Sequence, residues 1–122
     1  MLKKPLFKIA SLTQTDGQID AELQIDQQNE IFAGHFPDHP VVPGACMLQV
    51  VKEILADTVK ADIGLLRADN IKFLSLVEPS TDLLQLNITY QQTDSGLKIN
   101  ASLLAGEIAC MKLQGIFGLR YL

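Results

Sequence analysis

The sequence is short of the features that mark several classes of small protein. Among 122 residues it has no tryptophan and only two cysteines, Cys46 and Cys110. Disulfide-stabilised secreted domains carry more cysteines at closer spacing, so both are expected to be buried free thiols in a reducing compartment. Folding must then rest on a hydrophobic core, and a chain of this length with 48% hydrophobic residues can form one.

Charge and hydropathy exclude two kinds of partner. The chain has 14 acidic and 10 basic residues, giving a net charge of −4, and it has no basic run of the kind that binds nucleic acid. No apolar stretch is long enough to cross a bilayer, and the first residues are too few and too polar for a signal peptide. We expect one cytoplasmic domain over residues 1–122, without nucleic-acid or membrane partners.

Alternation of apolar and polar residues predicts most of the secondary structure, because a half-buried strand shows a period of two. The strands expected from alternation, or from apolar runs bounded by turns, are residues 6–13, 18–25, 71–77, 84–91, 97–103 and 108–119. Asp16–Gly17 is a strong hairpin signal between the first two. Gly115 and Gly118, inside the last strand, are expected to mark a bend or a close approach of backbones.

Residues 30–60 differ from the rest of the chain. Pro37, Pro40 and Pro43 recur every third residue, and each disfavours helix, so the first half should be an irregular, stiff arm. From Gly44 to about residue 60 apolar residues recur at helical spacing, which predicts one long helix ended near Gly64. An α+β fold follows, in which an antiparallel sheet of about six strands wraps around a central helix. Its open edges favour at least a dimer.

The arm and the helix start carry the candidate chemistry. A helix N-terminus offers free backbone amides, so Gly44 could receive a carbonyl oxygen that becomes negative during a reaction. Histidine is the residue type whose unperturbed pKa lies near neutrality, and His35 lies on the proline arm. A base beside such a donor is the minimum needed to remove a proton alpha to a thioester carbonyl. No Asp, Glu or Cys cluster accompanies the histidine, so no metal is expected.

The segment Gly34-His-Phe-Pro-Asp-His-Pro-Val-Val-Pro-Gly44 closely resembles the signature of the hot-dog-fold 3-hydroxyacyl-acyl-carrier-protein dehydratases. The resemblance implies a hot-dog fold and a dimer, with assembly into a hexamer left open. It also implies an acyl tunnel at the dimer interface, entered by the phosphopantetheine arm of an acyl carrier protein, with no other cofactor. By the same resemblance His35 takes the C2 proton and the Gly44 amide binds the thioester oxygen. We also expect Phe36, Pro43, Ala45 and Glu53 to contact the substrate.

One position departs from that family. The resemblance places an acid fourteen residues after the histidine, reaching the partner's site, and here that position is Gln49. A carboxamide cannot protonate a leaving hydroxyl, and general acid catalysis is worth about 10²–10⁴-fold. The family tends to have Gln one turn later, where this chain has Glu53, so the two residue types are exchanged.

Several interpretations of this exchange remain open. Gln49 could hold the leaving hydroxyl while His35 moves the proton, or Glu53 could supply the acid from about 5.4 Å further along the helix. Alternatively, the chain is inactive and binds acyl carriers or pairs with an active related chain. Both residues could also belong to a polar stripe that faces water, with Ala56, Asp57 and Lys60.

The function favoured by the sequence is dehydration of a 3-hydroxyacyl thioester to the trans-2-enoyl form, in fatty-acid or polyene- and polyketide-type synthesis. The alternative is an accessory hot-dog subunit without catalysis, as a homodimer or as a heterodimer with a related chain. An acyl thioesterase is a third option, for which Glu53 would have to activate water.

Overall fold

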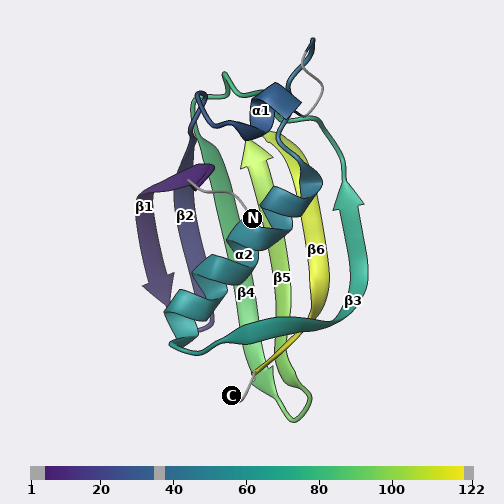
Figure 1. The fold of residues 1–122 in the computed structure, drawn as a ribbon. Helices are drawn as coiled ribbons and strands as arrows, with labels where there is room; N and C mark the ends of the chain where they lie inside the picture. Colours follow the sequence, from purple (N-terminus) through teal and green to yellow (C-terminus); the bar gives the residue numbers. More distant parts are fainter. Residues whose placement is uncertain (1–4, 35–37, 120–122) are drawn as a thin grey trace.

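A computed structural model describes residues 5–34 and 38–119. Six antiparallel strands form one sheet in the order β1-β2-β4-β5-β6-β3, with a long helix lying across one face (Figure 1). The elements are β1 Phe7–Thr15, β2 Gln18–Ile25, α1 Ile31–Gly34, α2 Gly44–Val59, β3 Ile63–Phe73, β4 Leu84–Thr93, β5 Gly96–Ala105 and β6 Ile108–Leu119. The α+β prediction of a sheet of about six strands around one central helix is confirmed.

The helix α2 is held on the sheet by one apolar face. Its buried side chains are Met47, Val50, Val51, Ile54 and Leu55. They meet the inward-facing residues of the sheet, among them Leu23, Leu86 and Leu103, each with no exposed surface. Each such burial contributes about 1.5–3 kcal/mol, so the position of α2 on the sheet is strongly fixed.

The end of α2 differs from the prediction. The helix ends at Val59, and Lys60 adopts a left-handed conformation with φ 57° while its amide donates to the Ala56 carbonyl. Gly64, predicted to stop the helix, lies inside β3 opposite Gly118 of β6. A lysine in the left-handed region terminates this helix, which a rule based on glycine could not identify.

The strand β3 is also longer than predicted. It begins at Ile63 instead of residue 71 and ends at Phe73 instead of Val77. Two register shifts against β6 break the alternation of its side chains, so residues 63–70 carry no strand pattern in the sequence. The close approach expected at Gly115 is present, because a Cβ there would lie 2.6 Å from the backbone oxygen of Arg67.

The segment that precedes the prolines is partly helical, whereas the sequence predicts an irregular arm there. Residues Ile31–Gly34 form the short helix α1, and the Asn29 side-chain oxygen accepts a hydrogen bond of 3.0 Å from the Ile31 amide. This is an N-terminal cap, which lets one helical turn form ahead of the prolines. The described part of the arm, residues 38–43, has neither helix nor strand, as predicted.

Candidate active site at the start of α2

The proline arm is anchored immediately before the helix. Val41 and Val42 are buried, and the Val42 amide donates a hydrogen bond of 2.8 Å to the carbonyl of Val77 in the segment after β3. Pro43 follows in an extended conformation with φ −64° and ψ 142°, as the residue that caps α2. The arm therefore enters the helix from a fixed direction.

The first amides of α2 find no backbone acceptor within the described part of the chain. Pro43 makes no side-chain cap, and its carbonyl accepts from the amides of Cys46 and Met47 at 3.0 and 3.4 Å. Among the described residues, the amides of Gly44 and Ala45 donate to no other backbone group. Two N–H groups at a positive helix end can together receive a developing negative oxygen, as the sequence suggested for Gly44.

An aromatic ring that the sequence pattern does not single out lies on Gly44. A Cβ at that position would stand 2.7 Å from Cζ and 2.8 Å from Cε1 of Phe73, the last residue of β3. Phe73 is 52% exposed, so it packs on the glycine while much of the residue remains open to solvent. Nothing distinguishes Phe73 in the sequence from the other apolar residues of its strand. Its position follows from the pairing of β3 with β6.

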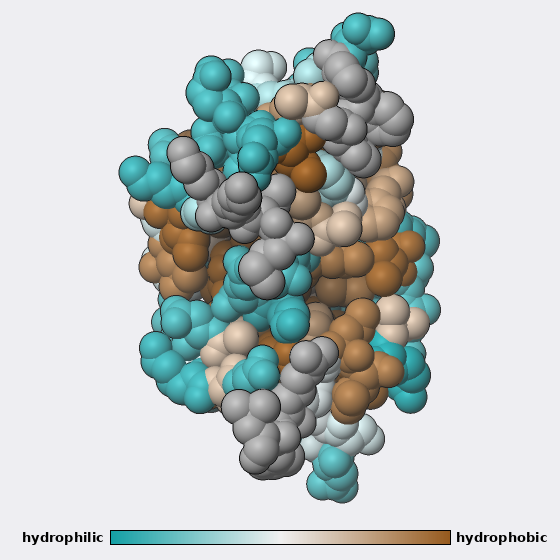
Figure 2. Space-filling model, in the orientation of Figure 1, coloured by the Kyte–Doolittle hydropathy of each residue, from teal (hydrophilic) through white to brown (hydrophobic). Residues whose placement is uncertain are grey.

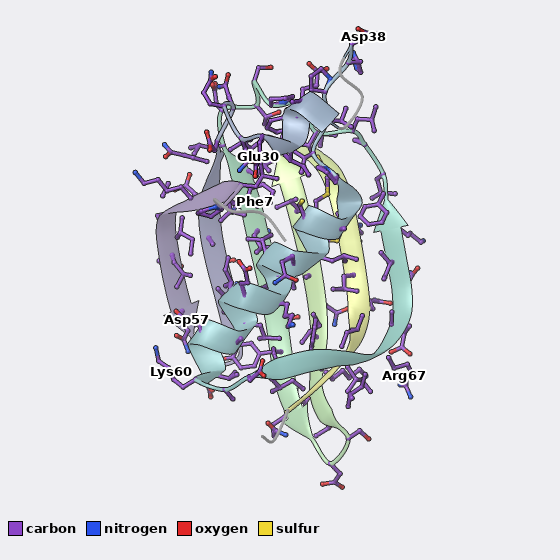
Figure 3. All side chains as sticks on the ribbon, in the orientation of Figure 1. Phe7, Glu30, Asp38, Asp57, Lys60 and Arg67 are labelled. Carbon is purple, nitrogen blue, oxygen red and sulfur yellow. The ribbon has the colours of Figure 1, made fainter. Side chains whose placement is uncertain are left out.

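Gln49 and Glu53 act as a pair on the exposed side of α2. The Gln49 Nε2 donates a hydrogen bond of 3.0 Å to Glu53 Oε1, and both residues are exposed in the single chain. Asp57 and Lys60 continue this polar side to the C-terminal end of α2, far from Asp38 and the arm (Figure 3). The predicted polar stripe is therefore present at these four residues, whereas Ala56, also predicted to belong to it, packs partly against the core. Because Gln49 uses one amide hydrogen on Glu53, its carbonyl oxygen remains available as an acceptor.

The remaining predicted residues divide into two groups. Pro43 and Ala45 lie at the helix start beside Gly44. His35 and Phe36 lie outside the described residues. Of the two free cysteines, Cys110 is buried as predicted, whereas Cys46 is only half-buried. Burial raises the pKa of both thiols, so neither is poised as a thiolate nucleophile at neutral pH.

Hydrophobic surface gathers on the side of the molecule next to this site. Figure 2 shows brown surface over β3, at the right of the view. The exposed apolar residues of this strand and the segment after it are Leu65, Leu66, Phe73, Leu74 and Leu76. The strand β3 is also an edge of the sheet.

Residues 5–34 and 38–119 contain neither a metal-binding cluster nor a membrane-spanning helix. In that part of the chain no three His, Cys, Asp or Glu residues lie together as a possible metal site. It likewise contains no helix that is both long enough and apolar enough to cross a membrane.

A six-stranded antiparallel sheet around one central helix, with a proline arm leading into the helix, defines a hot-dog fold. The chain belongs to the ApeI-like dehydratase family, whose family model matches residues 11–110. The resemblance seen in the motif is thereby confirmed for the family.

Curated relatives agree with this membership. The chain is 30% identical over 105 residues to the 3-hydroxyacyl-[acyl-carrier-protein] dehydratase FabZ of Oceanobacillus iheyensis, covering 80% of this chain and 75% of that one. It is 27% identical over 95 residues to the FabZ of Xylella fastidiosa, covering 70% of this chain. The match spans only 59% of the Xylella protein's length.

Solved structures share the fold. The dehydratase heterocomplex ApeI:P from Xenorhabdus doucetiae contains a chain that superposes with a TM-score of 0.77 at 19% identity, covering 96% of this chain and 99% of that one. An uncharacterized protein from Erwinia carotovora gives a TM-score of 0.72 at 23% identity, covering 95% and 97%. At these identities the likeness concerns the fold alone.

Proposed function

We propose that this protein removes water from a 3-hydroxyacyl thioester carried on the phosphopantetheine of an acyl carrier protein, giving the trans-2-enoyl thioester. One observation carries the proposal. In a chain of a dehydratase family, the Gly-His-Phe-Pro arm leads into a helix whose first two amides are free of other described backbone acceptors. These amides can stabilise the negative oxygen of the enolate that forms when the C2 proton is removed.

The steps are assigned to the chain's own residues as follows. His35 takes the proton from C2 of the substrate, and the amides of Gly44 and Ala45 stabilise the thioester oxygen as it gains negative charge. The C3–OH bond then breaks, the C2–C3 double bond forms, and the proton held by His35 joins the departing hydroxyl as water. The ring of Phe73 forms one wall beside the oxyanion donors.

The Gln49–Glu53 pair fits an assisting role. A carboxamide cannot supply the proton, so His35 has to serve both steps in this proposal. Since Glu53 holds one N–H of Gln49 at 3.0 Å, the Gln49 carbonyl can accept a hydrogen bond from the 3-hydroxyl and orient it. Glu53 itself is committed to this contact, which argues against its acting as the replacement acid.

We also propose a homodimer formed through the edge of β3. An exposed edge strand with apolar side chains is unfavourable for a monomer, and pairing two copies would cover it. Leu66 is 65% exposed on this strand, and Phe73 connects the strand to the site. A dimer of this kind would bring the second copy next to the helix start and could enclose the acyl chain.

The experiment is dehydration of a 3-hydroxyacyl carrier-protein thioester by the purified protein, with mass spectrometry for the loss of one water. We expect slow turnover that His35→Ala abolishes, and Gln49→Glu should increase it by restoring a general acid. The matched control is Asp57→Asn, on the same exposed side of α2 but at its other end. Activity that survives His35→Ala would refute the assignment.

A second candidate is an accessory subunit that pairs with an acid-bearing related chain. Two observations favour it: Gln49 stands where the resemblance implies an acid, and the structural neighbour from Xenorhabdus is a heterocomplex. In this case the protein alone shows no turnover at any acyl length. Activity then appears only on addition of a second dehydratase chain, and His35→Ala still lowers it.

A further inference from the structure

The sheet face opposite α2 carries a group of lysines. Lys112 alternates along β6 with the buried Met111 and Leu113, so its side chain points away from the helix. Lys72 of β3 lies directly opposite Lys112 in the register, and Lys98 of β5 lies further along the same face. We call Lys72, Lys98 and Lys112 the lysine face.

No described ion pair involves any residue of the lysine face. All three lysines are exposed, and the one ion pair among the described residues joins Arg67 to Asp69 at 2.7 Å. Asp69, which lines the same hollow as Lys98, is thus already paired with Arg67. Like charges directly opposite each other on neighbouring strands are destabilising, and here they stand in a chain of net charge −4. The pair Lys72–Lys112 is therefore an unrelieved local concentration of positive charge.

The surface between these lysines is hollowed and rich in hydrogen-bonding groups. Two shallow hollows of about 300 and 360 Å³ share Asn100 and Gln114, and Ser102 lines the larger one. Lys98 stands at the first hollow together with Asp69, and Lys72 and Lys112 stand at the second. Amides and hydroxyls between cations suit an extended acidic surface.

The spacing selects among anionic ligands. Lys98 faces Ile116, four residues from Lys112 along β6, which is about 13 Å at the rise of a strand. A single phosphate can meet Lys72 and Lys112 but not Lys98 as well. An acidic helix of two to three turns, at about 5.4 Å a turn, spans the whole face.

A second copy of this chain fits the face less well. Asp20 lies on the same face, in β2, at the other side of the sheet, and Asn87 and Ser102 connect it to Lys112 across the strands. The row of side chains from Asp20 through Asn87 and Ser102 to Lys112 is polar throughout. Interfaces between copies of one chain instead have an apolar core. The charge imbalance instead matches a transient partner of opposite sign, whose approach it would accelerate.

We propose that the lysine face is a docking surface for the acidic helical surface of a different protein. This does not rest on the proposed reaction, because the face lies on the other side of the sheet from α2. The interaction is electrostatic, so it strengthens at low salt and weakens as the ionic strength rises.

The test is NMR titration of the ¹⁵N-labelled protein with a synthetic helical peptide that carries glutamates along one side. The same peptide with lysines in their place is the negative control. We expect amide shifts along β3, β5 and β6, and about fivefold weaker binding for both Lys72→Glu and Lys98→Glu. Lys60→Glu, with the same charge change at the end of α2, should leave the affinity unchanged.

A second readout separates binding from folding. Lys72→Glu places a carboxylate opposite Lys112, so it should raise the melting temperature while it weakens binding. Equal shifts from inorganic phosphate, with Lys98→Glu having no effect, would show a small-anion site and overturn the proposal. A change of oligomeric state on Lys72→Glu in sedimentation would identify a contact between copies and overturn it too, as would peptide shifts located elsewhere.

Discussion

The contact between Phe73 and Gly44 allows a quantitative test of how the site is built. Gly44→Ala fits the backbone, because Gly44 is not among the positive-φ glycines. Its new Cβ would stand 2.7 Å from the Phe73 ring, where carbon atoms prefer about 3.5–4.0 Å. The ring must therefore withdraw by nearly an ångström.

Two opposing terms set the magnitude. Overpacking costs about 1–3 kcal/mol, and the low end applies because a half-exposed ring can swing outward. Replacing glycine gains about 0.4–1 kcal/mol through the unfolded chain. Gly44→Ala should thus destabilise the native protein by about 0.5 kcal/mol. In a Phe73→Ala background the clash is gone, and the same change should stabilise by about 0.5 kcal/mol.

The assay is a double-mutant cycle in urea, with a coupling free energy of about 1 kcal/mol expected between the two positions. Gly115→Ala is the control. Its Cβ would meet the Arg67 backbone oxygen at 2.6 Å, which cannot swing away, so it should cost about 2–3 kcal/mol whether or not Phe73 is present. A coupling below about 0.3 kcal/mol between Gly44 and Phe73 would refute this packing of the ring on the glycine.

Three further predictions follow from the site and the sheet edge. Glu53→Ala should lower the rate of dehydration about threefold, because it frees the Gln49 carboxamide from its hydrogen bond. The side-chain ¹⁵N resonance of Gln49 should shift in this variant, and an unchanged resonance would contradict the 3.0 Å contact. Leu66→Lys at the β3 edge should convert a dimer into monomers in light scattering, whereas Ile9→Lys on the opposite edge strand should not; equal effects would exclude the β3 interface. Burial raises the pKa of both thiols, so the folded state is favoured while they are protonated, and stability should fall as the pH rises above the ordinary thiol value of 9.0. Replacing Cys46 and Cys110 by alanine should remove that fall in urea titrations, and a persisting fall would assign it to other groups.

Local sequence is sufficient for much of this protein. Alternation predicts β2, β4 and β5 to within two residues at each end, because a strand with one buried face needs a period of two. An apolar run bounded by a turn predicts β6. The prolines and the apolar spacing after Gly44 predict the arm and α2, since these constraints act within a few residues. The motif from Gly34 to Gly44 indicates the right family by itself, because its glycines and prolines stand at fixed spacing around the histidine.

The tertiary structure decides what depends on register between distant segments. The strand β3 exists because it pairs with β6, and its two irregularities remove the alternation that would have revealed it. The same pairing places Phe73 on Gly44 and Lys72 opposite Lys112, forty residues away in the chain. Lys60 ends α2 in a conformation that residue type disfavours. Such contacts are set by the packing of the whole sheet on one helix, so no local pattern could specify them.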